Sequence, residues 1–238
     1  MKLTILMYHK VDELEQGVRH PGNFVTPAAF AEQLDALSEW GYRTITFDDW
    51  LAYRNERTVL PDKPLIVTFD DGYTCFHDHA WPELKRRKMG ATVFLVASQI
   101  GGVNAWESDE IRLPLLDATR IRTLQGEGVA FGSHSVSHRP LARISLDEAA
   151  FELSRSRALL TDLLGRDVDV FAYPFSNQSP EVRALARKAG YRCAVRGKGR
   201  MNSPTTDVFG LRRIKIEPTT TVEGLRLTLM RERYLRLF

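Results

Sequence analysis

Cysteine, long apolar runs and blocks of like charge are all scarce in this chain. Its 238 residues include two cysteines, Cys75 and Cys193, which are too few for a disulfide framework and fit a reducing compartment. The opening segment MKLTILMYHKVDE holds an apolar stretch of about six residues, shorter than a signal-peptide core or a membrane span. We therefore expect a cytoplasmic protein.

The charge of the chain is nearly balanced. Lys and Arg number 33 against 30 Asp and Glu, for a net charge of +3, and the charges are spread without a long run of one sign. Such a mild excess does not predict nucleic-acid binding. A basic, partly amphipathic segment, 225–238, ends the chain and is predicted to be a helix; contact with a membrane surface is one interpretation, and packing against the rest of the fold is the favoured one.

What the sequence does contain is an alternation of strand and helix patterns. Runs of β-branched and aromatic residues predict strands over 3–9, 42–47, 64–70, 91–97, 128–134, 168–174, 191–196 and 210–216. Capping residues and terminal glycines predict helices over 26–41, 145–165 and 179–190. Because no repeat or linker divides the chain, we expect one domain over 1–238. The alternation favours a parallel sheet covered by helices, closed or nearly closed into a β/α barrel of seven or eight units with its chemistry at the carboxyl ends of the strands.

One strand pattern ends in two adjacent carboxylates. The stretch PLIVTFDDG, 64–72, passes from apolar residues directly into Asp70 and Asp71 and then a turn-forming glycine. Two like charges side by side raise each other's cost of ionisation, so a shared cleft at a strand end is one explanation for the pair. A plain Asp-Gly turn is the alternative.

A second strand pattern ends in two histidines. His134 and His138 in GSHSVSH are four residues apart, so one turn of helix would place both imidazoles on one face, close enough to ligate one metal ion. Two hydrogen-bonded surface histidines are the alternative. One Asp with two His suits a divalent ion, with Zn²⁺ favoured and Co²⁺ or Ni²⁺ as alternatives. The second Asp is then free to take a proton from water.

These two motifs resemble those of the polysaccharide deacetylases of the NodB-homology type, which are metal-dependent enzymes that remove acetyl groups from sugars. TFDDG, 68–72, is similar to the first motif of that family, and HSVSH, 134–138, is similar to the second. The resemblance extends over most of the chain and implies a distorted β/α barrel. It also implies that Asp70 is the general base and that the metal ligands are Asp71, His134 and His138.

The third motif departs from the family pattern, which usually runs Arg-x-Pro-Tyr. The matching stretch here is FAYPFS, 171–176, which keeps Pro174 and Phe175 but has Ala172 in the place of the arginine. The resemblance implies that Tyr173, Pro174 and Phe175 form a wall of the substrate groove, with a backbone N–H near Phe175 binding the oxyanion.

Two groups of the family pattern must therefore come from elsewhere. Arg212 or Arg213, in the last strand pattern, is predicted to orient the base in place of the missing arginine. No histidine follows His138, whereas the family normally has a C-terminal histidine as general acid. In a branch that includes the poly-N-acetylglucosamine deacetylases this histidine lies on the first strand, and LMYHKV, 6–11, resembles that arrangement. His9 is then the general acid; a histidine that only caps a strand end is the alternative.

Together these features predict a hydrolase that uses a divalent metal to remove an N-acetyl or related N-acyl group from an amino sugar in a polysaccharide or glycan precursor. Tyr73, directly after the paired carboxylates, is predicted to line the groove. One alternative is deformylation or deacetylation of a small or lipid-linked sugar intermediate, which a cytoplasmic location favours. Another is a carbohydrate-binding protein that has lost catalysis, for which the missing arginine is the only support.

Overall fold

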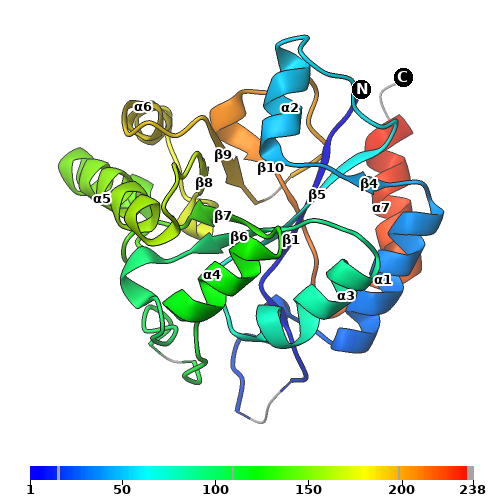
Figure 1. The fold of residues 1–238 in the computed structure, drawn as a ribbon, viewed down its shortest axis with the longest axis horizontal. Coiled ribbons are helices and arrows are strands. Elements are labelled where there is room, and N and C mark those ends of the chain that lie inside the picture. The colour runs from blue at the N-terminus through cyan, green and yellow to red at the C-terminus, as the bar shows by residue number, and fades with distance from the viewer. Residues whose placement is uncertain (15–16, 109, 198, 235–238) are drawn as a thin grey trace.

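The computed structural model describes residues 1–14, 17–108, 110–197 and 199–234, and it places the helices around a central sheet (Figure 1). Within the described residues the sheet has nine strands, in the order β10-β9-β8-β7-β6-β5-β1-β11, with β4 paired to β5. Its strands are β1 (Thr4–Tyr8), β4 (Arg43–Thr44), β5 (Pro64–Phe69), β6 (Thr92–Leu95), β7 (Ala130–Ser133), β8 (Val170–Ala172), β9 (Cys193–Arg196), β10 (Leu211–Arg212) and β11 (Ile214–Lys215). A separate pair joins β2 (Lys10–Val11) to β3 (Phe24–Val25).

The central strands of the sheet are buried on both faces. β1 and β5 are buried along their whole lengths and pair in parallel from Thr4 with Leu65 to Tyr8 with Phe69. Strands of this kind appear in a sequence as continuous hydrophobic runs, which is why their positions could be predicted. The predicted distorted β/α barrel is confirmed by this parallel sheet and by the helices that flank it.

The two end strands of the sheet, β10 and β11, follow each other in the chain and are not paired with each other. The predicted last strand, 210–216, is wrong as a single element, because it consists of two short strands, β10 and β11, which pair with β9 and β1 respectively. Arg213 lies between them, and its backbone N–H still donates to the Arg196 carbonyl at 2.9 Å. One residue therefore joins the two ends of the sheet order.

Three helices begin and end at the signals predicted from the sequence. The Thr26 hydroxyl caps the first of them, Ser145 and Glu148 form a capping box at the second, and Gly165 ends the second in a left-handed conformation with φ of 65°. The helices are α1 (Pro27–Glu39), α2 (Phe47–Arg54), α3 (Trp81–Arg86), α4 (Ala118–Gly126), α5 (Leu146–Leu164), α6 (Pro180–Lys188) and α7 (Val222–Tyr234), with a π-helical turn, Phe76–Ala80, directly before α3.

The sequence patterns above do not predict α2, α3 and α4, and the predicted strand 42–47 is wrong in its second half. β4 ends at Thr44, and α2 begins at Phe47. The Thr46 hydroxyl accepts a hydrogen bond from the Asp49 N–H, while the Asp49 carboxylate accepts from the Thr46 N–H at 2.8 Å. This capping box starts a helix where β-branched residues alone favour a strand.

The basic C-terminal segment forms most of α7, which lies beside α1 (Figure 1). Leu225 and Leu229 are buried in the core, whereas Leu227 and Met230 are exposed. Residues 235–238 of that segment lie outside the described residues. In the described part of the chain, no helix is both long enough and apolar enough to cross a bilayer.

Gly132 in β7 is a position where we expect no side chain to fit. A Cβ there would lie 2.6 Å from the Phe94 ring and 2.9 Å from the Val170 carbonyl oxygen. Overpacking of this kind costs about 1–3 kcal/mol, so Gly132→Ala is expected to lower the free energy of unfolding by that amount in urea denaturation. Gly126→Ala is the control, because a Cβ there has no neighbour within 4 Å; equal losses in both variants would contradict the packing argument.

Candidate active site

Polar side chains from several strands meet at the carboxyl ends of the sheet. Asp70 and Asp71 directly follow β5, His134 follows β7, and His9 follows β1. All four line one open cavity of about 600 Å³, a volume typical of small-molecule sites. The complete lining is Met7, His9, Asn23, Asp70, Asp71, Trp106, Glu107, His134, His138, Tyr173, Phe175, Ser176, Gly197, Gly199, Lys215 and Glu217.

Asp71, His134 and His138 are brought together as a possible set of metal ligands. Asp71 Oδ1 lies 3.5 Å from His134 Nε2 and 3.3 Å from His138 Nε2, and one ligand atom from each residue falls within 4.8 Å of the others. His134 Nδ1 lies 2.7 Å from the Ala172 carbonyl oxygen. Since a carbonyl only accepts, Nδ1 carries the proton and Nε2 presents its lone pair to Asp71.

The chemistry of these three residues fits a divalent ion. Asp71 Oδ1 is buried and has no hydrogen bond of normal geometry. Burial is the largest effect and opposes ionisation of Asp71, but the interactions with His138, His9 and His134 together outweigh it and hold the pKa of this carboxyl well below its usual range. Burial also lowers the pKa of His134 to about 4, so this imidazole is neutral at neutral pH. An ionised carboxylate with a neutral imidazole is the state in which these groups bind metal.

The two histidines do not lie on a turn of helix, contrary to the expectation from their spacing. Residues 134–138 form a loop in which Ser135 and His138 have positive φ angles of 69° and 60°. The Ser135 hydroxyl accepts a hydrogen bond from the His138 N–H at 2.9 Å. Left-handed backbone is uncommon in residues other than glycine and persists only where the surroundings hold it.

Glu152 of α5 holds this loop, and the sequence analysis did not identify it. Its side chain is 4% exposed and accepts hydrogen bonds from the Val136 N–H at 2.8 Å and from the Ser137 N–H at 3.0 Å. The Ser137 hydroxyl donates a third, at 2.5 Å. The sequence feature that could have identified Glu152 is its position as an acidic residue on the buried face of an amphipathic helix, beside Ala149 and Leu153.

Asp70 is paired with Arg213. The guanidinium donates from Nη1 to Oδ1 at 2.6 Å and from Nη2 to Oδ2 at 2.7 Å, and both residues are buried. Burial is the largest effect and opposes ionisation of Asp70, but the charge and hydrogen bonds of Arg213, together with His134 and His9, outweigh it and hold the pKa of Asp70 below its ordinary value. Two parallel hydrogen bonds also fix the plane of the carboxylate. Arg212, the other arginine predicted for this role, lines a different cavity.

His9 lies in the same cavity as the two carboxylates. Its Nδ1 is buried with no hydrogen-bond partner in the described part of the chain. Burial lowers the pKa of His9, while the negative charges of Asp71 and Asp70 act in the opposite direction. An imidazole with an uncommitted nitrogen beside a groove is available for proton transfer.

Aromatic rings enclose His138 from two directions. Trp106 stacks on the imidazole at a centroid distance of 4.7 Å, and Phe175 meets it edge to face at 4.6 Å. Phe175 is 62% exposed and has a positive φ of 55°. A strained backbone that presents a large apolar ring to solvent is a feature of binding sites.

Of the other residues predicted to line the groove, one lies on the groove wall and two do not. Tyr173 lines the cavity, whereas Tyr73 and Pro174 do not. Tyr73 is buried, and its hydroxyl donates to Glu107 Oε2 at 3.1 Å; its ring also contacts the buried Lys10 ammonium at 4.6 Å. Because Glu107 is part of the wall, Tyr73 lies behind the groove and supports it.

A β/α barrel that collects carboxylates and imidazoles around one open groove at its strand ends has the layout of an enzyme. The family model described as polysaccharide deacetylase matches residues 57–194. That match covers more than half of the chain, so the chain belongs to the polysaccharide deacetylase family, and the resemblance drawn from its motifs is confirmed. The match includes the paired carboxylates and both loop histidines, while His9 and Arg213 lie outside it.

Relatives of the chain are distant but similar over most of its length. YxkH of Bacillus subtilis strain 168, which bears the same family name, is 25% identical over 219 residues, covering 91% of this chain and 72% of that protein. The poly-beta-1,6-N-acetyl-D-glucosamine N-deacetylase of Staphylococcus aureus strain MRSA252 is 22% identical over 196 residues, 81% and 67% of the two chains. The structure of the Streptococcus pyogenes deacetylase PplD in complex with acetate is similar in fold, with a TM-score of 0.82, 24% identity and coverage of 96% and 98%.

Removing the guanidinium of Arg213 is expected to destabilise the protein. Arg213→Met leaves the Asp70 carboxylate buried without a partner, which costs about 3–5 kcal/mol of unfolding free energy in comparable buried pairs. Urea denaturation measures the loss. Arg212→Met is the neighbouring control and is expected to cost less than about 1 kcal/mol. Adding Asp70→Asn to Arg213→Met should restore part of the stability; no recovery would contradict the unpaired charge as the cause.

Proposed function

We propose that this protein is a metal-dependent N-deacetylase that removes acetyl groups from N-acetylated amino sugars in a polysaccharide. One observation carries the proposal: Asp71, His134 and His138 converge beside a second carboxylate, Asp70, that faces the same groove but is bound to Arg213. The name of the Staphylococcus aureus relative, a poly-N-acetylglucosamine N-deacetylase, supports this substrate class. The acetate in the Streptococcus pyogenes structure is consistent with the product.

Asp71, His134 and His138 would hold the ion, for which Zn²⁺ is our first choice and Co²⁺ or Ni²⁺ the alternatives. A divalent ion in such a site supplies Lewis acidity toward an acyl oxygen and makes water a better nucleophile at neutral pH. This division of roles accounts for two adjacent carboxylates, one as a ligand and one as a base.

Asp70 accepts the proton of the attacking water in this proposal. Arg213 holds its carboxylate in one orientation and keeps it ionised, so the base is always in its proton-accepting form near neutral pH. A depressed pKa weakens a carboxylate as a base, and fixed orientation offsets this because it removes the entropic cost of positioning. The proposal assigns the developing oxyanion to a backbone N–H near Phe175, and the place of Phe175 on the groove wall supports this.

His9 donates a proton to the departing nitrogen. An amine leaves an acyl carbon readily only when it is protonated, so an acid in the groove beside the base is required. The uncommitted Nδ1 of His9 and its place in the cavity wall support this role.

The catalytically lapsed alternative loses its only support. That alternative rested on Ala172 at the position of the family's arginine, and Arg213 supplies a guanidinium to Asp70 from the last part of the sheet. A small or lipid-linked substrate remains the second candidate within the same reaction class, and the exposed Leu227 and Met230 on α7 are the feature that favours a lipid-linked one.

Substitution of the two carboxylates should separate metal binding from turnover. Asp71→Asn is expected to abolish binding of one equivalent of Zn²⁺ in isothermal titration calorimetry. Asp70→Asn is expected to bind Zn²⁺ as the wild type does but to lose about 10²–10⁴-fold in kcat, the usual contribution of a general base. Full activity in Asp70→Asn would rule out Asp70 as the base.

The role of His9 can be tested by comparing a substrate whose leaving group needs a proton with one whose leaving group does not. His9→Gln is expected to slow release of acetate from an N-acetylated sugar about 10²–10⁴-fold, because the amine must be protonated. Hydrolysis of 4-nitrophenyl acetate should fall by less than about tenfold, since nitrophenolate leaves without a proton. An equal loss on both substrates would indicate that His9 only supports the structure.

The substrate itself is tested by measuring acetate and formate released from a panel of N-acylated sugars. The panel holds monomers and β-1,6- and β-1,4-linked oligomers, and each is assayed with Zn²⁺, with Co²⁺ and with a chelator. We expect metal-dependent acetate release that is fastest with an oligomer. Release that is fastest with a monomer would support the small-substrate candidate, and no release from any member by the metal-loaded protein would contradict the proposal.

A further inference from the structure

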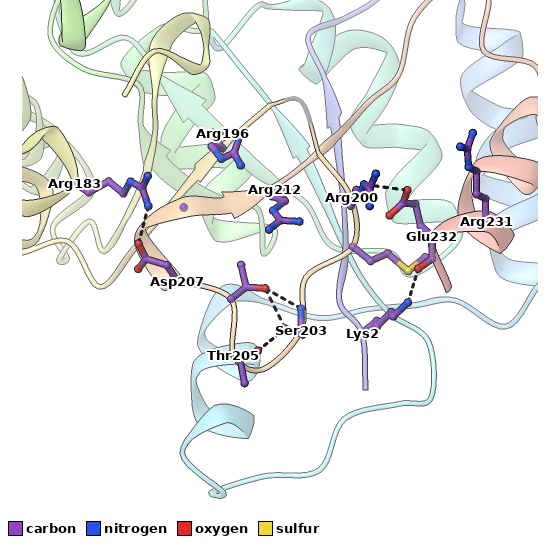
Figure 2. Close-up of a pocket in the computed structure, with 13 residues that line it drawn as sticks. Lys2, Arg183, Arg196, Arg200, Ser203, Thr205, Asp207, Arg212, Arg231 and Glu232 are labelled. Atoms are coloured by element: carbon purple, nitrogen blue, oxygen red, sulfur yellow. Dashed lines mark hydrogen bonds and ion pairs between the residues drawn. The ribbon is translucent and has the colours of Figure 1, made fainter. Parts of the chain in front are cut away.

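A second cavity lies apart from the catalytic groove and is strongly basic. It has a volume of about 510 Å³, within the range of small-molecule sites, and shares no lining residue with the groove. Its lining includes six cationic side chains and two carboxylates (Figure 2). The cationic residues are Lys2, Arg183, Arg196, Arg200, Arg212 and Arg231, and the acidic residues are Asp207 and Glu232.

The positive charges of this cavity are only partly neutralised. Asp207 pairs with Arg183 at 3.0 Å, and Glu232 lies 3.9 Å from Arg200. Arg196 and Arg212 have no ion-pair partner among the described residues, and Figure 2 shows them between Arg183 and Arg200. Burial lowers the pKa of Arg196, and the charges of Arg212 and Arg183 lower it further. The unpaired guanidinium groups of Arg196 and Arg212 thus lie close to Arg183. A bound anion would stabilise this cluster of positive charges.

Close backbone packing positions the elements that carry Arg212 and Arg183. A Cβ at Gly199 would lie 2.3 Å from Arg212 Cβ and 2.9 Å from the Arg213 backbone nitrogen, so glycine lets the segment after β9 lie directly against β10. A Cβ at Gly210 would lie 3.3 Å from Arg183 Nη1. Arg196 and Arg212 therefore lie on the paired strands β9 and β10, and Arg183 lies on α6.

The polar groups of the cavity match a tetrahedral oxyanion. Ser203, Thr205 and Thr206 add three hydroxyl groups to the lining. Their hydroxyls now hydrogen-bond to one another, at 2.8 Å and 3.3 Å, so they can turn to donate to a ligand. Several guanidinium forks together with hydroxyl donors are the usual environment of a phosphate group.

We propose that this cavity binds a phosphate-bearing small molecule, a phosphate monoester or diester of a size that fills more of the space than phosphate alone. The lining residues Arg196 and Arg212 contact the phosphoryl oxygens, and the hydroxyls of the 203–206 turn complete its hydrogen bonds. This site is separate from the deacetylase groove, although Arg212 precedes the residue that holds Asp70.

Isothermal titration calorimetry with inorganic phosphate and with glucose 1-phosphate tests the proposal at fixed ionic strength on the metal-loaded protein. We expect saturable 1:1 binding that is at least tenfold weaker in Arg196→Gln and in Arg212→Gln. Arg122→Gln and Arg155→Gln remove the same charge from exposed positions on α4 and α5 and should change the Kd by less than twofold. Tighter binding of glucose 1-phosphate than of phosphate would identify an ester as the ligand, and the reverse order would overturn the ester assignment.

Two further titrations test whether the phosphate binding is only nonspecific charge attraction and whether it takes place at the metal centre. Acetate at the same ionic strength is expected to bind at least tenfold more weakly than phosphate, and phosphate binding should persist in Asp71→Asn. Equal binding of acetate, or loss in Asp71→Asn with retention in Arg196→Gln, would overturn the proposal. If Arg212→Gln does not fold, Arg200→Gln carries the same expectation at a side chain that is 70% exposed.

Discussion

The fold depends on a buried ion pair between Arg213, which lies where the sheet changes strands, and Asp70, which lines the groove. Arg213 is the residue at which the chain leaves the β9 edge of the sheet and crosses to β1. Its side chain donates to Asp70 and to Thr68 at the end of β5, which lies on the other side of β1 in the sheet. Breaking a buried charge pair leaves an uncompensated charge in the interior, so the position of β11 and the orientation of the Asp70 carboxylate depend on each other.

The paired carboxylates are stable because each has a different partner. Asp70 interacts with an arginine from the end of the sheet, whereas Asp71 faces two imidazoles from the loop after β7. The positive φ of 76° at Asp71 turns the backbone sharply between the two residues. Adjacent acids in sequence therefore enter different electrostatic surroundings, and the repulsion expected from their spacing is offset on both sides.

The sequence predicted the parts of this fold that depend on local signals. Apolar runs gave the central strands, and capping residues such as Ser145 gave the helices. The position of Asp70 and Asp71 at a strand end followed from the same pattern. The choice between Arg212 and Arg213 could not be made, because it depends on a one-residue break between two strands that pair with partners far apart in the chain. The loop of His134 was likewise misjudged, since its left-handed residues are held by Glu152, a contact from another helix.

The break at Arg213 also sets an order of events during synthesis. Asp70 and Arg213 are 143 residues apart, so at roughly 5–20 residues per second a ribosome takes about 7–30 s between them. Throughout this interval β1 lacks its β11 partner, and Asp70 lacks the Arg213 guanidinium. The last strand pairing of β1 and the ion pair of Asp70 are therefore completed together, after residue 213 has been synthesised.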